Sequence, residues 1–211
     1  MKLVVHKTHE ELFTSTNDWL IHELNKTKVN ALFLPAGNTL KPLYKRWRGG
    51  NFPPQLKNFR LLQLDEIIEG EKQGIFQFFF KQELPELSVE APSEKAYEGT
   101  AIAILGLGMN GHIAFHEPEL PPDFSFGTVA LSQGSAQNLG VTPGTKACSY
   151  GLGTFLRLPS LLLVVTGEKK QEIFSRLLKQ DPALPATQLL KHPNLTIFCD
   201  SSLGKNSPKI T

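Results

Sequence analysis

The sequence predicts an α/β protein, built as a single domain with a Rossmann-like, mostly parallel sheet and helices on both of its faces. Short apolar runs with the length of buried strands recur along the chain, for example at residues 29–34, 101–105 and 161–166. Segments with helical spacing alternate with these runs, and the connections between them are short. No linker, internal repeat or low-complexity segment divides residues 1–211. We therefore expect one domain that spans the whole chain.

The expected helices follow from the spacing of apolar side chains. Residues 8–26 place Leu12, Leu20 and Leu24 on one face, and Thr8 and Glu11 have the spacing of a capping box. Further helices are expected at residues 40–47, 74–82, 150–156 and 167–178, with a short helical turn at 187–190.

The expected strands are apolar runs that end at polar or glycine-rich turns. They lie at residues 29–34, 59–64, 101–105, 161–166 and 195–199. A further strand at 126–131 is expected to take the chain back across the same sheet. Residues 133–146 are rich in Gly, Ser, Asn and Thr, which predicts a loop or a flexible flap. The polar tail at 200–211 is expected to fray.

Composition excludes several classes of protein. The net charge of +2 is small and dispersed, so nucleic acid is not an expected partner. No apolar run approaches the roughly 18 residues of a membrane-spanning helix. Cys148 and Cys199 are far apart in the sequence, which argues against a disulfide scaffold or a structural zinc site. We expect a soluble cytoplasmic protein that acts without a membrane.

Polar side chains follow several of the predicted strands. Because the carboxyl ends of parallel strands lie along one edge of a sheet, we expect these side chains to line one pocket. A strand-to-helix turn can hold a phosphate, and a carboxylate with a histidine suits acid–base chemistry on an anionic small molecule. The candidates, in chain order, are Gly37, Asn38, Thr39, Asp65, Asn110, His112, Glu117 and Lys170.

The segment at 106–118, Gly-Leu-Gly-Met-Asn-Gly-His-Ile-Ala-Phe-His-Glu-Pro, closely resembles the signature of glucosamine-6-phosphate deaminases (isomerases). That signature usually has the form Gly-x-Gly-x-Asp-Gly-His-Ile-Ala-Phe-Asn-Glu-Pro. Leu-Pro-Ala-Gly-Asn-Thr at 34–39 resembles the family's phosphate loop, and Leu-Asp-Glu at 64–66 its Met-Asp-Glu segment. Tyr-Gly-Leu-Gly-Thr at 150–154 and Val-Thr-Gly-Glu-Lys-Lys at 165–170 also resemble family segments, in the same order.

The resemblance implies a mechanism that needs no cofactor and no metal. His112 would open the sugar ring by moving a proton to the ring oxygen, with Glu117 in its relay. Asp65 would shuttle a proton between C2 and C1 and so form an enolamine. Water would then displace ammonia and leave a ketose phosphate. The phosphate would be held by Gly37, Asn38, Thr39 and Lys170.

The chain departs from the family pattern at identifiable positions. The aspartate before Gly-His is Asn110, which can accept a hydrogen bond from the imidazole but supplies no negative charge. The asparagine of Phe-Asn-Glu-Pro is His116, and residues 131–137 contain only neutral residues where the family has a phosphate-binding arginine. The basic residues used for allosteric activation in some hexameric members are missing from 124–131. We therefore do not expect this allosteric activation. We expect a homo-oligomer, but the number of its subunits is left open.

Three functions are consistent with these residues. The first is an amino-sugar-6-phosphate isomerase and deaminase, with the hexosamine epimer left open. The second is a 6-phosphogluconolactonase, a hydrolase on the same fold whose loop usually continues with Thr-Ala-Ser-Leu-Phe-Pro after Gly-His. The third is a catalytically weak sugar-phosphate-binding protein, because of Asn110 and the absent arginine. In all three, the partner is a small-molecule sugar phosphate.

Overall fold

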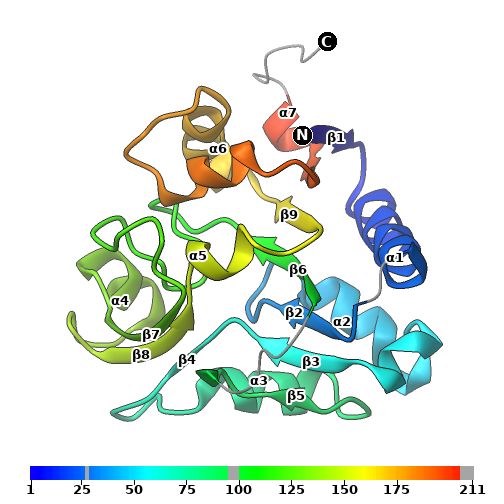
Figure 1. Cartoon of the computed structure of the whole chain (residues 1–211), viewed down its shortest axis with the longest axis horizontal. Helices are drawn as coiled ribbons and strands as arrows, with labels where there is room; N and C mark the ends of the chain where they lie inside the picture. Colours follow the sequence, from blue (N-terminus) through cyan, green and yellow to red (C-terminus); the bar gives the residue numbers. More distant parts are fainter. Residues whose placement is uncertain (27–28, 95–99, 205–211) are drawn as a thin grey trace.

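A computed structural model of the chain describes residues 1–26, 29–94 and 100–204. Its centre is a seven-stranded parallel sheet with the strand order β1-β10-β9-β6-β2-β3-β5 (Figure 1). The predicted α/β class is therefore confirmed. The strands are β1 (Lys2–His6), β2 (Ala31–Leu34), β3 (Arg60–Gln63), β5 (Val89–Glu90), β6 (Ala101–Gly106), β9 (Leu161–Val165) and β10 (Leu195–Asp200).

Helices cover both faces of this sheet. In the central strand β6, Ala103 and Leu105 pack with side chains of α5 (Leu152–Phe155) and α6 (Gln171–Leu178). Ile102 and Ile104 alternate with them and pack on the opposite face. That face is covered by α1 (His9–Lys26), α2 (Lys41–Trp47) and α3 (Ile75–Glu83). A strand buried on both faces is apolar at every position, which is why β6 is a continuous apolar run.

The N-terminus of α1 follows the sequence signal at Thr8. The backbone N–H of Glu11 donates to Thr8 Oγ1 at 3.1 Å, as a helix N-cap requires. The described residues also include the 3₁₀ segments η1 (Arg48–Gly50), η2 (Pro54–Asn58), η4 (Glu168–Lys170) and η5 (Pro185–Lys191). No helix in the described ranges is long and apolar enough to cross a membrane.

A second sheet was not predicted. It contains three antiparallel strands in the order β4 (Asp65–Ile67), β8 (Lys146–Tyr150) and β7 (Phe126–Ala130), and it lies beside the main sheet (Figure 1). The prediction that residues 126–131 return across the main sheet is wrong, because β7 pairs with β8 instead. In β4, Asp65 pairs with Ser149, so the second sheet holds Asp65 directly beyond the end of β3.

The segment at 133–146 is a loop only in its second half, at residues 140–145. It begins with helix α4 (Gln133–Leu139), whose N-cap Ser132 accepts a hydrogen bond from the N–H of Ser135 at 3.3 Å. Gly140 closes the helix with φ +63°, a conformation that favours glycine. Polar composition hid this helix, because most of its surface faces solvent and Ala136 is among its few buried residues.

Other boundaries also differ from the predictions. Tyr150 ends strand β8 rather than beginning a helix, and α5 begins two residues later. Strands β1 and β5 were not predicted. Within the tail expected to fray, Asp200 ends β10 and Ser201–Gly204 form α7. Residues 205–211 lie outside the described residues.

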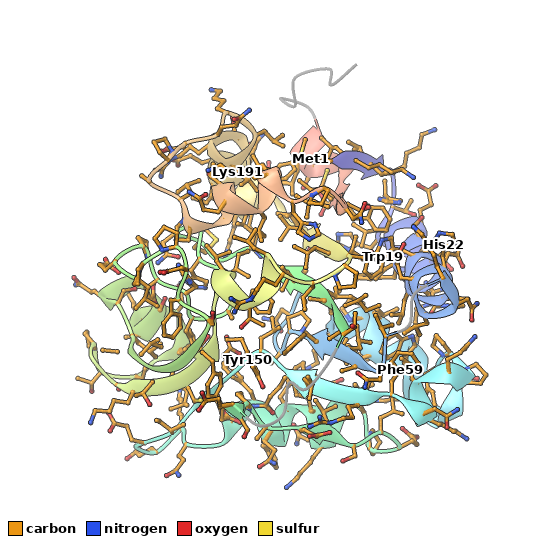
Figure 2. All side chains as sticks on the ribbon, viewed as in Figure 1. Met1, Trp19, His22, Phe59, Tyr150 and Lys191 are labelled. Carbon is orange, nitrogen blue, oxygen red and sulfur yellow. The ribbon has the colours of Figure 1, made fainter. Side chains whose placement is uncertain are left out.

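Tyr150 connects the two sheets. Its side chain, labelled in Figure 2, is buried. Its ring packs edge-on against Phe33 of β2, with 4.9 Å between the ring centroids. Its hydroxyl donates to the carbonyl of Ser93 at 2.6 Å. This residue therefore joins the second sheet to the core of the first.

Glu66 of β4 anchors α3. Its buried carboxylate accepts from the backbone N–H groups of Ile67, Phe76 and Gln77 at 2.9, 3.0 and 2.7 Å, and from Gln63 Nε2 at 3.1 Å. A carboxylate is favourable there because the free N–H groups of the first helical turn carry partial positive charge.

We expect Glu66→Ala to lower the free energy of unfolding by about 2–4 kcal/mol, because it leaves several buried N–H groups without an acceptor. Urea denaturation followed by circular dichroism would measure the change. Glu71→Ala, at an exposed position in the following turn, is the matched control and should change stability little. An equal effect of both variants would contradict this role of Glu66.

Candidate active site

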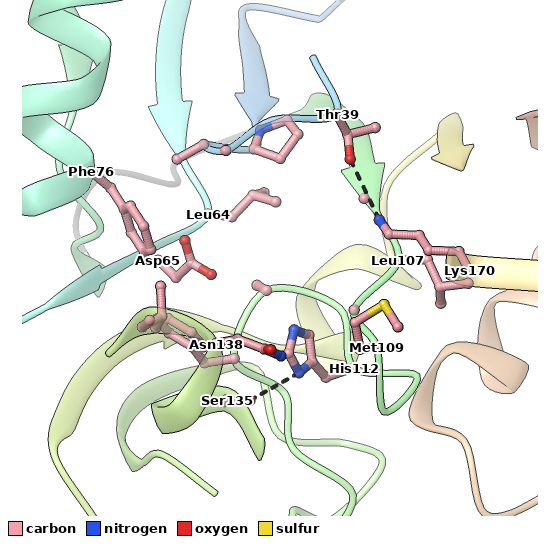
Figure 3. Close-up of a pocket in the computed structure, with 18 residues that line it drawn as sticks. Thr39, Leu64, Asp65, Phe76, Leu107, Met109, His112, Ser135, Asn138 and Lys170 are labelled. Atoms are coloured by element: carbon pink, nitrogen blue, oxygen red, sulfur yellow. Dashed lines mark hydrogen bonds between the residues drawn. The ribbon is translucent and has the colours of Figure 1, made fainter. Parts of the chain in front are cut away.

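A cavity of about 320 Å³ opens at the carboxyl ends of β2, β3, β6 and β9 (Figure 3). Five of the predicted site residues line it, namely Gly37, Thr39, Asp65, His112 and Lys170. Four lining residues that the sequence did not single out are Phe76, Met109, Ser135 and Asn138. The strand ends therefore form a single pocket. One wall of this pocket is α4, which lies where the sequence predicted a loop.

The other three predicted residues lie outside the cavity lining. Asn38 is exposed to solvent in the turn after β2. Asn110 and Glu117 do not line the cavity but contact His112 or each other behind it. Their contacts decide how the histidine is presented.

One end of the cavity is suited to an anion. Lys170 Nζ donates to Thr39 Oγ1 at 3.5 Å, so the turn after β2 and the turn after β9 meet there (Figure 3). Gly37 has φ +96°, a backbone conformation that residues with a side chain rarely adopt. Burial lowers the pKa of Lys170. Among the described residues, Lys170 is the cationic side chain that lines this cavity.

The turn that carries Lys170 is tied to the last strand. The N–H of Gly167 donates to Asp200 Oδ2 at 2.7 Å. The same carboxylate accepts from the N–H of Ser202 at 2.9 Å and lies 3.2 Å from His9 Nε2. Since Gly167 has φ +93°, the chain reverses sharply after β9, and Asp200 fixes that reversal.

Asp65 lies opposite the histidine. Its carboxylate projects into the cavity beside Phe76 (Figure 3). Burial, with a smaller contribution from the charge of Glu66, raises the pKa of Asp65 to about 7. A carboxylate with a pKa near neutrality can both remove and return a proton at physiological pH.

His112 lies against the backbone of Gly108. A Cβ atom at residue 108 would be 2.1 Å from His112 Cδ2, so only glycine leaves room for the ring. The N–H of Gly108 donates to the carbonyl of His112 at 2.9 Å, which closes the loop on itself. Ala114, two residues further, has φ +52° and also lines the cavity. The loop is thus a strained and closely packed segment at the site.

Glu117 is an ionised group buried beneath His112. Burial acts to raise its pKa, but the polar side chains of His112, Ser135 and Asn110 around it outweigh burial and lower the pKa to about 2. Its side chain is 3% exposed, and Oε2 lies 3.8 Å from His112 Nδ1. A fixed negative charge therefore lies close to the imidazole ring.

Asn110 contacts the carboxylate and the backbone rather than the ring. Its Nδ2 donates to Glu117 Oε2 at 2.9 Å, and its Oδ1 accepts from the backbone N–H of His112 at 3.2 Å. His116, the other departure from the signature, is buried, and its Nδ1 accepts from the N–H of Leu152 at 3.1 Å. His116 therefore anchors α5.

No protein-family model matches the chain. A glucosamine-6-phosphate deaminase from Bacillus thuringiensis is 31% identical over a 230-residue alignment that covers 95% of this chain and 87% of the relative. The same figures hold for a glucosamine-6-phosphate deaminase from Bacillus cereus. The chain belongs to the glucosamine-6-phosphate deaminase family. The suspected family is thereby confirmed.

Two solved structures share the fold. The structure of a monomeric glucosamine-6-phosphate deaminase has a TM-score of 0.78 at 22% identity, over 97% of this chain and 99% of that chain. A 6-phosphogluconolactonase from Leishmania guyanensis has a TM-score of 0.73 at 15% identity, over 97% and 98% of the two chains. Both show the same architecture at low sequence identity.

The site of this family member contains no metal-binding cluster in its described part, since no three His, Cys, Asp or Glu side chains gather there. Helix α4, which begins within the neutral segment at 131–137, presents Ser135, Asn138 and Leu139 to the cavity. Two signals could have revealed this helix, namely Ser132 as an N-cap and Gly140 as a C-terminal stop.

The contacts of Asn110 predict the effect of restoring the aspartate. Asn110→Asp would replace the donor to Glu117 with a second carboxylate, so we expect a loss of roughly 2–3 kcal/mol in unfolding free energy at pH 8. Part of the loss should be recovered near pH 5, because protonating one carboxyl removes the repulsion.

Thermal unfolding at several pH values would measure this effect. Asn25→Asp, at an exposed position of α1, provides the same substitution without a facing carboxylate. An Asn110→Asp protein as stable as the parent at pH 8 would show that Asn110 does not support Glu117.

Proposed function

We propose that the protein is an amino-sugar-6-phosphate deaminase that converts a hexosamine 6-phosphate and water into a ketose 6-phosphate and ammonia through an enolamine intermediate. The observation that carries the proposal is the cavity itself. The carboxyl group of Asp65, whose pKa is raised to about 7, faces His112 across the cavity (Figure 3). Lys170 lies at the end of the cavity that is suited to an anion. The family membership of the chain supports the same activity.

The phosphate end sets the position of the sugar. Lys170 provides the positive charge, and Thr39 and the turn at Gly37 provide polar groups beside it. A single lysine is a point charge, so its attraction depends little on the orientation of the phosphate. With the phosphate held there, the sugar ring extends toward Asp65 and His112.

The two titratable groups then have separate roles. His112 transfers a proton to the ring oxygen as the pyranose opens, and the carboxylate of Glu117 stabilises its charged form. Asp65 removes the proton from C2 of the opened 2-amino aldehyde, and the aldehyde oxygen O1 gains a proton, which gives the enolamine. Asp65 then returns its proton to C1 and the nitrogen loses one proton, which gives the ketimine at C2. Water adds at C2 and ammonia leaves, so the atoms of substrate and water are all accounted for. Exclusion of bulk water by Phe76 and Leu139 strengthens these electrostatic effects.

We further propose that the protein works in the cytoplasm on a free small-molecule sugar phosphate. Cys148 and Cys199 are both free thiols in the structure, which suits a reducing compartment. A sugar phosphate is a charged metabolite that needs no membrane or nucleic-acid surface to reach the cavity.

The direct test is a panel of glucosamine, galactosamine and mannosamine 6-phosphates, with ammonia release and ketose phosphate formation measured separately. We expect turnover of at least one hexosamine phosphate and a loss of roughly 10³-fold in Asp65→Asn. Hydrolysis of 6-phosphogluconolactone without ammonia release would instead establish the lactonase activity. Tight binding detected by calorimetry with no product would establish the sugar-phosphate-binding hypothesis.

The pKa of Asp65 predicts the pH dependence of the reaction. Because Asp65 must be ionised to act as the base, kcat/KM should rise with pH up to about 7 and then level off. Glu66→Gln removes the neighbouring negative charge, so the midpoint of this rise should move to lower pH. An unchanged midpoint would show that another group controls the rise.

The same raised pKa has a consequence for stability. The folded protein holds a proton on Asp65 that the unfolded chain releases near pH 4, so stability should fall as pH rises from about 4 to about 7. Asp65→Asn should remove this loss and leave an inactive protein that is more stable than the parent at pH 8.

A further inference from the structure

The ring nitrogen of His112 that faces away from the cavity has a hydroxyl partner. Ser135 Oγ lies 3.2 Å from Nδ1, which is a hydrogen-bond distance. Glu117 Oε2 lies 3.8 Å from the same nitrogen, which is too far for a direct hydrogen bond. Figure 3 shows the bond to Ser135 on one edge of the ring and the second nitrogen on the opposite edge, toward the cavity.

The residue that the family motif places beside the histidine is engaged elsewhere. Both polar ends of the Asn110 side chain are used, one by Glu117 and one by the backbone N–H of His112. These contacts hold the loop and the carboxylate in place, but they leave the ring nitrogen to another partner. Ser135 occupies that place.

Helix α4 holds this hydroxyl rigidly. Ser135 is 2% exposed, and its own N–H is bound to the N-cap hydroxyl of Ser132 at 3.3 Å. The N–H of Ser132 donates in turn to Glu117 Oε1 at 3.4 Å. The next residue, Ala136, is fully buried in the small core under the second sheet. The start of α4 is therefore docked on the same carboxylate that lies beneath His112.

The Ser135 hydroxyl contacts His112 Nδ1, and Ser135 is also one of the hydrogen-bonding partners that lower the pKa of Glu117. One arrangement of the hydroxyl proton satisfies all three groups. The carboxylate accepts the hydroxyl proton, and the hydroxyl oxygen accepts the proton on Nδ1. The reverse arrangement would aim the hydroxyl proton at the ring and leave an oxygen facing the charged oxygens of Glu117. The first arrangement also leaves Nε2 unprotonated and facing the cavity.

We propose that Ser135 is the positioning residue of His112. Its hydroxyl relays the charge of Glu117 to Nδ1 and so fixes the tautomer of His112 that presents a free Nε2 to the substrate. When Nε2 takes up a proton, the imidazolium keeps its Nδ1–H bond to Ser135, and no other proton has to move. The proposal rests on the proposed function only in giving His112 a proton-transfer role.

The test is ¹⁵N NMR of histidine-labelled protein at pH 8, with His112→Gln used to assign the His112 signals. We expect the parent protein to show a single neutral tautomer protonated at Nδ1. Ser135→Ala and Ser135→Cys, which remove the hydroxyl, should give averaged or reversed nitrogen shifts. Ser135→Thr keeps the hydroxyl and should restore the parental pattern.

Kinetics provide the second readout. We expect Ser135→Ala to lower kcat roughly 10- to 100-fold with little change in KM, and Ser135→Thr to recover most of that loss. Ser132→Ala is the control for a purely structural effect, because it removes the N-cap side chain of the same helix but not the bond to Nδ1. It should lower the melting temperature and keep the parental nitrogen shifts.

Parental nitrogen shifts in both Ser135→Ala and Ser135→Cys would overturn the proposal, as would the same altered shifts in Ser132→Ala. The NMR readout needs no substrate. A parent protein that turns over no hexosamine phosphate would therefore refute the proposed function while the tautomer measurement still tests Ser135.

Discussion

The buried charge of Glu117 is the constraint on which the architecture of the site depends. An ionised carboxylate that is 3% exposed is costly unless hydrogen bonds replace the lost water. Here the partners come from the signature loop, through Asn110, and from the start of α4, through the N–H of Ser132. Satisfying one carboxylate thus requires the loop and the helix to dock together. The same docking places Ser135 and His112 in contact, so the catalytic geometry is a consequence of compensating the charge.

The site also separates the properties of two carboxyl groups. Asp65 has a pKa raised to about 7, chiefly by burial, because few donors compensate its charge. Glu117 has a pKa of about 2 because several donors surround it despite its burial. Two residues of similar chemistry therefore have different tasks, one as an exchangeable base and the other as a permanent charge. The second sheet positions both carboxyl groups. Its strand β4 carries Asp65, and α4, whose start contacts Glu117, packs under the same sheet.

Substitutions within the signature make sense in this arrangement. Asn110 is a donor to Glu117, which an aspartate would not be at neutral pH. His116 is a buried acceptor for the first turn of α5. The neutral segment at 131–137 is where α4 begins, and its small polar side chains fit against the loop. Each substituted position therefore makes contacts that hold the site together in this chain. Lys170 is the charged side chain that faces an anionic substrate.

Much of the fold and part of the site followed from the sequence alone. Continuous apolar runs fully buried on both faces can hardly form anything but central parallel strands, so β2, β6 and β9 were predicted nearly to their ends. The order of motifs identified the family and placed Asp65, His112 and Lys170 at one sheet edge. These features are local, since each depends on residues close together in the chain.

The tertiary structure decided what depends on contacts between distant residues. Helix α4 is polar and short, and it is stable because its start docks on Glu117 and Ala136 is buried under the second sheet. Strands β4 and β8 are short and pair across more than 80 residues of sequence, which no local pattern predicts. The partner of the histidine was decided in the same way. The family resemblance pointed to Asn110, two residues from His112, as the partner. The folded chain instead brings in Ser135, 23 residues away, because a hydrogen bond depends on distance in space.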